Sequence, residues 1–430
     1  MTFDAASAKS TGMSAPSSEF APDPALASDA PQGASLHFVE FVALVAALMA
    51  LGALGIDSML PALPAIGLTL GVRDPGDFPL VITFFMIGFG LAQIVHGPLA
   101  DRYGRRPVLI VALCGYVLFN ALAALSHSFT LLLLARLAGG AMIASTRVVA
   151  VALVRDCYSG RAMARVSSLA FMTFMIVPVL APSFGQIVLL LGSWRLIFWA
   201  VAAIATLVVA WFTLRMPETL ADADREALSW RALARNWRIT VTDRHSLGYS
   251  LATTALQGAL FGYLGSIQPI MDKVFHRPAL LGIAFAASAG LMAVANLLNS
   301  QIVMRVGMRR ISQSALVMMI LASSASLTLT LSGSETLWLF VALQAVTMAS
   351  FGLAASNFSA MAMDKVGHIA GTASSVQGLV TTTGGALAGA LIGRAFDGTT
   401  VPLHIGFLAG GMIALVVIAI VERGRLFRPV

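Results

Sequence analysis

The chain has 430 residues, of which 58% are apolar and 11% charged, with 27 Lys and Arg against 20 Asp and Glu. A typical soluble protein is about 45–50% apolar and about 25% charged, so this composition excludes an ordinary water-soluble enzyme. The basic residues are not clustered as in a nucleic-acid-binding protein, and Cys114 and Cys157 show no metal-ligand or disulfide spacing. The sequence therefore predicts an integral membrane protein.

Apolar segments long enough to cross a bilayer follow one another along the chain. A hydrocarbon core about 30 Å thick needs roughly 20 apolar residues per helix, and backbone polar groups in lipid must be satisfied within the segment. We expect an all-α membrane protein with twelve transmembrane helices. The predicted spans are 38–68, 78–99, 107–126, 129–153, 165–191, 195–214, 247–270, 279–303, 311–331, 336–360, 369–393 and 404–421.

Polar stretches lie before, between and after these spans. Residues 1–36 are rich in Ala, Ser, Pro and Asp, which predicts a disordered cytoplasmic tail without the basic segment and short apolar run of a signal peptide. Residues 215–246 predict a cytoplasmic linker, and residues 422–430 a second cytoplasmic tail. The linker is either an amphipathic helix on the membrane surface or a solvated segment. The helical spacing that favours the first alternative is that of Ala227, Trp230, Ala234 and Trp237.

The distribution of basic residues fixes the expected orientation. With the N-terminus inside, twenty Lys and Arg fall on the cytoplasmic side and five on the other, while Arg136 and Arg147 lie within a span. Cytoplasmic loops of membrane proteins carry this excess. We therefore expect both termini to be cytoplasmic.

The spans form two similar halves, 37–214 and 247–421. Arg102-Tyr-Gly-Arg-Arg106 follows the second span, and Arg305-Val-Gly-Met-Arg-Arg310 follows the eighth, in the equivalent loop. This echo predicts two six-helix bundles related by a pseudo-two-fold axis, with a substrate site near the membrane midplane between them.

Several segments resemble motifs of the major facilitator superfamily. Gly97-Pro-Leu-Ala-Asp101-Arg-Tyr-Gly104-Arg-Arg106 is similar to its signature loop, and Arg136-Leu-Ala-Gly139 to its second motif. Pro178 and Ala181-Pro182-Ser-Phe-Gly185 resemble its antiporter motif, with Ala181 where Gly is usual. The resemblance implies the fold and the alternating access of that family.

Further segments resemble the Bcr/CflA drug-efflux branch. They are Glu40-Phe41, Asp57-Ser-Met-Leu-Pro-Ala-Leu-Pro64, Pro217-Glu-Thr-Leu220 and Gly367-His-Ile-Ala-Gly-Thr-Ala373. The likeness covers nearly all of 37–421, although Ser58 and Met59 replace the usual Met-Tyr. It implies a monomeric, multi-pass drug–proton antiporter of the bacterial inner membrane.

Asp57 is the one acid placed well inside a predicted span. A charge there costs at least about 2.5–3.5 kcal/mol on insertion scales, so we expect Asp57 to bind and release the coupling proton. Pro61 and Pro64 just beyond it loosen the helix. The alternative is an Asp that is hydrogen-bonded to neighbouring helices purely for packing.

Two arginines share one face of the fourth span. Arg136 and Arg147 are separated by close to three helical turns, about 16 Å along the axis, and each needs an acceptor: Asp57, a carbonyl, water or an anionic substrate group. The resemblance assigns Arg136 a structural and proton-relay role. Arg147 lies outside the motif and is either a substrate determinant or an arginine that snorkels toward the cytoplasmic interface.

A cytoplasmic gate is the function that the resemblance gives to the loop after the second span. An ion pair between Arg105 and Asp156 is feasible, and Asp101 is expected near the N-terminal dipole of the eleventh span. The other expected gate residues are Gly97, Arg102, Gly104 and Arg106.

Polar side chains of the second half are candidates for the substrate cavity, although each could equally form an interhelical hydrogen bond. They are Gln257, Tyr263, Gln268, Asn296 and Asn299. No metal site, cofactor site or phosphate-binding loop is expected, so the proton gradient would supply the energy.

The sequence thus predicts a proton-coupled antiporter that exports small molecules, with protons, substrate and the lipid bilayer as its partners and no nucleic acid. A proton-coupled uptake symporter on the same fold is the alternative, because fold does not fix direction. A non-transporting membrane receptor is a further alternative from another class. An enzyme is not expected, since no nucleophile–base pair or metal cluster can be assembled inside the membrane.

Overall fold

The computed structural model describes residues 36–158, 160–220, 225, 230–366 and 369–427, and leaves out some side chains, mostly within 160–179. The predicted tail 1–36 therefore lies almost wholly outside the described residues. Ala227 and the side chains of Trp230 and Pro178 also lie outside them.

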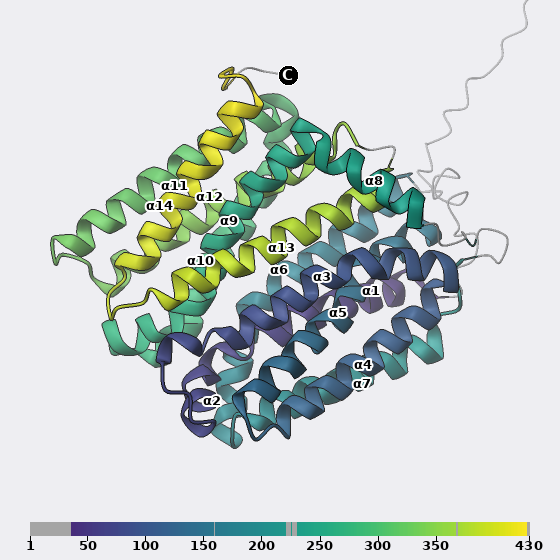
Figure 1. The fold of residues 1–430 in the computed structure, drawn as a ribbon, viewed down its shortest axis with the longest axis horizontal. Coiled ribbons are helices and arrows are strands. Elements are labelled where there is room, and N and C mark those ends of the chain that lie inside the picture. The colour runs from purple at the N-terminus through teal and green to yellow at the C-terminus, as the bar shows by residue number, and fades with distance from the viewer. Residues whose placement is uncertain (1–35, 159, 221–224, 226–229, 367–368, 428–430) are drawn as a thin grey trace, which may run out of the picture.

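All regular secondary structure in these described ranges is helical (Figure 1). The α-helices are α1 (Phe38–Asp57), α2 (Leu63–Thr69), α3 (Leu80–Tyr103), α4 (Arg105–Ala124), α5 (Phe129–Cys157), α6 (Gly160–Leu191), α7 (Arg195–Arg215), α8 (Trp230–Thr242), α9 (Arg244–Pro269), α10 (Leu281–Val306), α11 (Met308–Leu331), α12 (Leu337–Met363), α13 (Ala370–Arg394) and α14 (Val401–Val421). The expectation of an all-α membrane protein is confirmed.

Ten helical segments of the described part are long and apolar enough to cross a membrane. α6 and α9 are not among them: α6 contributes only the apolar stretch Leu180–Leu191, and α9 carries Ser, Thr, Tyr and Gln along its length. Both helices nevertheless have 26 residues or more. The count of twelve spans and the orientation of the termini stay predictions.

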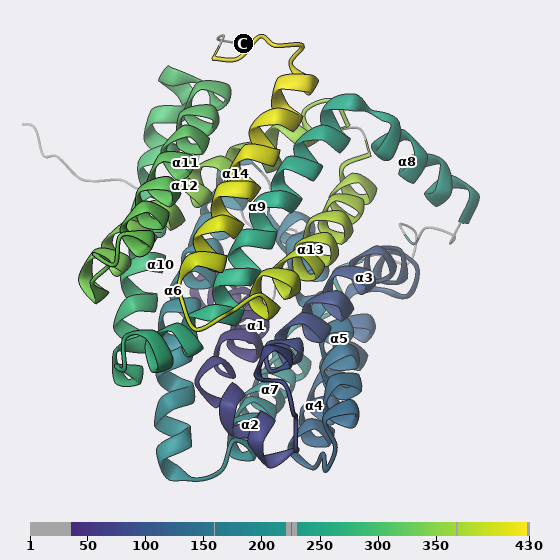
Figure 2. The same cartoon turned by 60° about the vertical axis from the view of Figure 1, so that its left-hand side comes forward.

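The helices of the first half gather on one side of the molecule and those of the second half on the other (Figures 1 and 2). α3 and α13 lie side by side where the two groups meet, and α6 packs against α10 at another point of contact. α5 packs mainly against α3 and α4, and α9 against α13 and α14. The contacts between the halves therefore involve few helices.

α1 ends early, and the chain then passes through a short 3-10 turn, η2 (Leu60–Ala62), into α2. Pro61 and Pro64 explain the interruption, because proline lacks the N–H that an α-helix interior requires. The helix ends at Asp57, so the only acid expected well inside a span lies at a break in the backbone.

The same backbone turn joins the second and third long helices of each half. Gly104, between α3 and α4, has φ 100° and ψ 154°, and Gly307, between α10 and α11, has φ 89° and ψ 145°. Only glycine adopts this region without strain. The two loops that echo one another in sequence thus have matching geometry.

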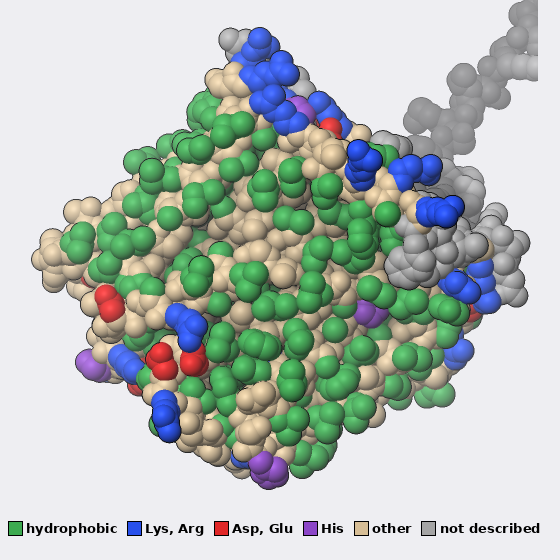
Figure 3. All heavy atoms as spheres, in the orientation of Figure 1, with side chains coloured by type: hydrophobic (Ala, Val, Ile, Leu, Met, Phe, Trp, Pro, Cys, Tyr) green, Lys and Arg blue, Asp and Glu red, His purple; other side chains and the backbone are tan. Residues whose placement is uncertain are grey.

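The surface is that of a protein in lipid. Leu190, Leu214 and Leu68 are 87%, 82% and 77% exposed, although burying such a side chain is worth about 1.5–3 kcal/mol. Figure 3 shows hydrophobic side chains across the whole breadth of one face, with charged side chains mostly toward its edges. Acyl chains would cover these leucines.

α8 matches part of the predicted linker helix and lies at one edge of the bundle beside α9 and α13 (Figure 1). Arg231, Arg235 and Arg238 are exposed, whereas Leu233 and Trp237 are half-buried. The helix is therefore amphipathic, and its place on the membrane surface stays a prediction.

Candidate functional site

Asp57 lies at the break between α1 and η2, with its side chain only 4% exposed. No described residue donates a hydrogen bond to it or forms an ion pair with it. The hydroxyl of Ser58 beside it is also buried without a hydrogen-bond partner in the described part of the chain. A buried carboxylate normally has a positive charge or several donors around it, so Asp57 has no structural partner that would explain its presence.

Arg136 is buried in α5 and binds backbone, not Asp57. Its Nη2 donates to the Gly55 carbonyl at 2.8 Å and its Nε to the Val81 carbonyl at 3.2 Å. The guanidinium also lies 4.1 Å from the ring centre of Phe85. The acceptors of this arginine are thus backbone carbonyls, one of the alternatives considered from the sequence. The two hydrogen bonds connect α5 to α1 and α3.

Arg147 is exposed and has no hydrogen-bond or ion-pair partner among the described residues. At about 100° per residue, it lies about 160° around α5 from Leu131, whose exposed side chain marks the lipid side. Around the helix axis, Arg147 points between the directions of two other residues. One is Arg136, which bonds to α1, and the other is Gly140, which packs on Phe85 of α3. Arg147 thus projects from the inner side of the first bundle.

α6 approaches the break in α1 very closely. A Cβ atom on Gly185 would overlap the carbonyl oxygen of Ser58 and lie 3.0 Å from Cγ of Pro61. Pro182, one turn earlier, is buried. The end of the antiporter-motif segment therefore contacts the turn that follows Asp57.

The candidate cavity residues of the second half are not gathered at one place. Tyr263 is buried and donates to the Ser288 hydroxyl at 3.3 Å, and Asn296 donates to the Met292 carbonyl of its own helix at 3.0 Å. Gln268 lines a pocket at the end of the bundle that is predicted to be periplasmic. Gln257 is half-buried in α9 and packs against α13 at Gly385, and Asn299 accepts a hydrogen bond from Asn357 at 3.1 Å.

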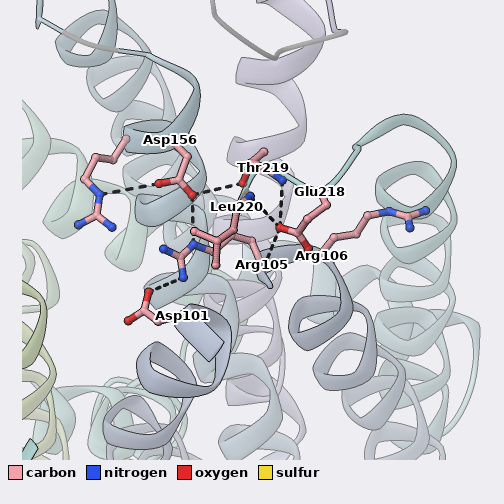
Figure 4. A network of polar contacts seen from close by, with 8 residues as sticks. Asp101, Arg105, Arg106, Asp156, Glu218, Thr219 and Leu220 are labelled. Atoms are coloured by element: carbon pink, nitrogen blue, oxygen red, sulfur yellow. Dashed lines mark hydrogen bonds and ion pairs between the residues drawn. The ribbon is translucent and has the colours of Figure 1, made fainter. Parts of the chain in front are cut away.

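Arg105 is the centre of a polar network at the predicted cytoplasmic end of the first half (Figure 4). Its Nε donates to Asp156 at 3.1 Å, and its Nη1 pairs with Asp101. Thr219 donates to the same Asp156 carboxylate at 3.3 Å. The network joins α3, α4, α5 and the segment after α7, and the Arg105–Asp156 pair considered from the sequence is present.

Glu218 is part of this network, and sequence reasoning gave it no role. Its carboxylate accepts the backbone N–H groups of Arg105 at 2.9 Å and Arg106 at 3.1 Å, the first two residues of α4. A carboxylate at a helix N-terminus satisfies free N–H groups and complements the helix dipole. Gly104 lies directly beside it, and a Cβ there would overlap the carboxylate and displace it.

The remaining gate residues lie around this network, and Arg106 joins it only through its backbone N–H. Arg106 donates to the Thr213 carbonyl at 2.8 Å. Arg102 is exposed and stacks over Tyr103. A Cβ on Gly97 would lie 3.6 Å from Val148 in α5 and 3.9 Å from Ser375 in α13, so Gly97 lies where α3 meets both helices.

A second set of contacts joins the two halves at the opposite end. Arg394, at the end of α13, pairs with Asp77 before α3 at 2.6 Å. A pocket of about 420 Å³ lies beside this pair, and both halves line it. Its charged lining residues from the second half include Asp272, Lys273 and Asp397. Hydrogen bonds from Thr399 hold the pKa of Asp397 below its ordinary value. Charged side chains of both signs thus surround this pocket.

The described residues offer no metal centre, since no three His, Cys, Asp or Glu side chains among them are close enough to hold an ion. The buried pair of His404 and Glu335, 2.9 Å apart, joins the start of α14 to the α11–α12 loop. Thr400 donates to the same Glu335, which satisfies that carboxylate locally. This cluster fits a structural role.

Known bacterial proteins similar to this chain include an MFS-type transporter and two drug-resistance proteins. It is 28% identical to the uncharacterized MFS-type transporter YdgK of Bacillus subtilis over 78% of this chain and 84% of that protein. It is also 28% identical to the bicyclomycin resistance protein homolog of Haemophilus influenzae (84% and 90% covered) and to the multidrug resistance protein MdtL of Klebsiella pneumoniae (86% and 92%).

Structural similarity and a family model agree with these relatives. The crystal structure of the human organic anion transporter MFSD10 (TETRAN) matches with a TM-score of 0.65 at 18% identity, covering 90% of this chain and all of that one, which shows the shared fold. The sequence model of the Major Facilitator Superfamily matches residues 43–390. The chain belongs to the Major Facilitator Superfamily and is a multi-pass membrane transporter of small molecules, not an enzyme.

Proposed function

We propose that this transporter exports small drug-like or metabolite compounds across the bacterial inner membrane in exchange for protons. The observation that carries the proposal is Asp57, a buried carboxyl group at a helix break without a described partner. A group so placed can be neutral in one conformation and ionised in another without losing a structural bond. That is what proton coupling requires.

The relatives favour export over uptake. Two of the three bacterial relatives described above are named for drug resistance, one for bicyclomycin and one for multiple drugs. At 28% identity this likeness supports the class of function and leaves the compound open. A symporter on the same fold is the second candidate.

The proposed cycle follows from the cost of burying charge. An ionised Asp57 inside the membrane costs at least about 2.5–3.5 kcal/mol on insertion scales, so the two halves would reorient with Asp57 protonated or with substrate bound. Protonation from the periplasm and release toward the cytoplasm would then return the carrier. Arg136 would hold the α1 backbone beside Asp57 through Gly55 and so preserve the geometry of the site.

Arg147 is the proposed substrate residue that the geometry favours most, because it is unpaired and lies on the inner side of α5. Gln257, half-buried in α9, is the favoured residue of the second half. Tyr263 and Asn296 already have partners, and Gln268 lies at the pocket near Arg394. These three would contact substrate only in another conformation.

The network around Arg105 is proposed to be the cytoplasmic gate. Asp101 keeps 44% of its side chain exposed although it pairs with Arg105. That exposed carboxylate would bind the N-terminus of α13 when the cytoplasmic side closes. The carrier is proposed to work as a monomer, since each bundle presents lipid-exposed leucines on its outer side.

Proton flux in inside-out vesicles tests this function. Vesicles with an acid interior receive a panel of antibiotics and metabolites, and a pH-sensitive dye reports protons leaving with wild type, Asp57→Asn and Asp364→Asn. Asp364 is exposed between α12 and α13, so its variant controls for the loss of one acid. We expect at least one compound to dissipate the gradient with wild type and Asp364→Asn but not with Asp57→Asn.

The other outcomes reject parts of the proposal. Dissipation that persists with Asp57→Asn would make Asp57 structural. Substrate-driven proton movement of the opposite sign would show a symporter. Binding of a compound without any proton or substrate flux would show a receptor.

A further inference from the structure

α8 presents three arginines on the side that points away from the rest of the protein. Arg231, Arg235 and Arg238 follow one another at helical spacing, so they form one face of the helix, and all three are exposed. None of these arginines has a hydrogen bond or an ion pair with another residue in the described part of the chain. Neighbouring like charges on a helix destabilise it, so this arginine face fits a negatively charged partner.

The opposite face of α8 packs on the protein. Thr240 is 2% exposed and lies about 180° around the helix from Arg231, and Leu233 and Trp237 beside it are half-buried. These contacts are with α9 and α13. A helix of 13 residues is marginal in water on its own, so the stability of α8 depends on these contacts and on what binds its arginine face.

The junction with α9 places α8 at the level of lipid headgroups. Asp243 alone separates the two helices, and its carboxylate accepts the Ser246 N–H at 2.7 Å. The predicted seventh span begins at Leu247, so the end of α8 lies within about 10 Å of it, and the headgroup layer is about 5–8 Å thick on each side of a bilayer. Figure 3 shows Lys and Arg side chains bordering the hydrophobic face along the edge where Figure 1 places α8.

Apolar side chains flank the arginine face on either side. Ile239 is 37% and Val241 41% exposed. The glycerol and upper acyl region of a lipid would cover these side chains, whereas a purely ionic partner would leave them in water. A basic helix with neighbouring apolar side chains is typical of segments that bind anionic membranes. The surroundings of the arginines therefore favour a phospholipid as their partner.

We propose that anionic phospholipid headgroups bind the arginine face of α8 and hold this helix on the bilayer surface. A guanidinium group presents a planar fork of N–H donors that matches the oxygens of a phosphate. Each basic residue near an anionic leaflet strengthens binding about fivefold, so the three arginines together strengthen it by roughly a hundredfold. This binding depends neither on the direction of transport nor on the role of Asp57.

The bound helix would also restrain the boundary between the two halves. Gln377 of α13 donates to the Ser246 hydroxyl of α9 at 3.2 Å, and Arg244 of α9 donates to the Ile420 carbonyl of α14. α13 packs in turn against α3 of the first half. Anionic lipid would thus hold the ends of α9, α13 and α14 together at the predicted cytoplasmic side.

Hydrogen exchange of the full chain in nanodiscs tests this binding without a known substrate. Nanodiscs of phosphatidylcholine alone are compared with nanodiscs of an equal mixture with phosphatidylglycerol, and mass spectrometry follows the amides of α8. We expect these amides to exchange about tenfold more slowly in the mixture, because headgroups bound to the arginine face oppose local opening. Arg231→Gln, Arg235→Gln and Arg238→Gln combined should exchange equally fast in both lipids.

Two variants control for charge and for structure. Arg305→Gln, Arg423→Gln and Arg425→Gln combined remove the same charge from exposed residues on the same predicted side, and should keep the slower exchange of α8 in the mixture. Lysine at all three positions of the arginine face keeps the charge and should keep most of the effect. Complete loss of the effect in the lysine variant would contradict an ionic attraction to headgroups.

The wild-type comparison decides the proposal even if a variant does not fold, since only the lipid is changed. Added salt should reduce the difference between the two lipids, because exposed charges are screened. Equal exchange of α8 in both lipids would overturn the proposal. If the glutamine variant then exchanged faster than wild type in both, the partner would be an acidic segment of the chain itself, such as the one containing Asp4, Glu19, Asp23 and Asp29.

The link to the boundary between the halves is tested separately in the same experiment. Amides in the first turns of α13 should also exchange more slowly in the mixture with wild type and not with the glutamine variant. A response of α8 without one of α13 would reject this link and leave the lipid binding intact.

Discussion

Arg136 and Arg147 lie on one helix but in opposite circumstances. Arg136 is 2% exposed and satisfies two backbone carbonyls from α1 and α3. Arg147 is exposed and has no partner among the described residues. A guanidinium that bonds to two other helices contributes to folding, whereas an unpaired one on the inner side is free to bind something else.

Stability measurements should separate these two arginines. Arg136→Ala leaves two buried carbonyls without donors, so we expect a loss of about 2–4 kcal/mol in the free energy of unfolding. Arg147→Ala removes no bond within the described structure and should change it by less than about 0.5 kcal/mol. Thermal unfolding of both variants in one detergent checks this. Equal losses would mean that Arg147 is also structural.

Arg147, which is expected to matter little for stability, should instead affect which substrates are exported. If Arg147 binds an acidic or strongly accepting group of the substrate, Arg147→Gln should slow export of acidic compounds more than export of their uncharged esters. The loss of one charge-assisted hydrogen bond, about 1.5–3 kcal/mol, corresponds to roughly a tenfold or greater weakening. Uptake into inside-out vesicles at several concentrations measures it. An equal effect on acids and esters would remove Arg147 from substrate recognition.

At the scale of helices, the two matching loops differ in what surrounds their glycines. Gly104 and Gly307 have almost the same backbone angles, but a Cβ on Gly104 would overlap Glu218, whereas a Cβ on Gly307 would meet no described atom. In the second half Glu422, after α14, pairs instead with the Arg309 side chain at 3.2 Å. Both halves thus bring a glutamate from behind their last helix to this loop, and only the first uses it as a helix cap.

Replacing Gly104 or Gly307 by alanine should therefore destabilise the protein by unequal amounts. Both variants bear backbone strain of order 1–3 kcal/mol, while Gly104→Ala also displaces the Glu218 cap, worth about 1 kcal/mol more. Hydrogen exchange of the first turn of α4 should rise in Gly104→Ala and in Glu218→Gln. Gly307→Ala should leave α4 unchanged. Faster exchange of α4 in Gly307→Ala would show that the loops are coupled by another route.

The sequence was sufficient for features that depend on local pattern. Long apolar runs predicted the helices, and Pro61 and Pro64 predicted the loosened segment after Asp57. It was not sufficient for contacts between distant segments. The Glu218 cap joins residues 113 positions apart, and nothing in the local sequence shows that a carboxylate will meet those N–H groups. The acceptors of Arg136 are backbone carbonyls, which every residue carries, so pattern alone could not select them.

At the scale of the whole molecule, an ion pair between Asp77 and Arg394 joins the two halves. Pro79 packs against Gly265 and Gly393 beside it, at 3.1 Å and 3.7 Å from the Cβ positions of those glycines. The first half is thus closed against the second at the end predicted to be periplasmic. Opening this end must break the ion pair and separate Pro79 from both glycines.

The size of the ionic contribution can be predicted. Arg394 keeps 54% and Asp77 26% of the side chain exposed, and ion pairs of this kind contribute about 0.2–1 kcal/mol. Asp77→Asn should therefore increase the open population by no more than about fivefold, since each 1.4 kcal/mol is a factor of ten. A reporter Gln268→Cys in the pocket, in a Cys114→Ser background, should react correspondingly faster with a membrane-impermeant maleimide.

Charge reversal decides whether the pair itself is responsible. Asp77→Arg with Arg394→Asp should return the maleimide rate toward that of the parent, whereas Arg73→Gln, at an exposed residue in the same loop, should not change it. A rate increase far above fivefold would mean that Asp77 also holds the packing of Pro79. No increase would assign closure of this end to the glycine contacts alone, because these apolar surfaces are buried whatever the charge at Asp77.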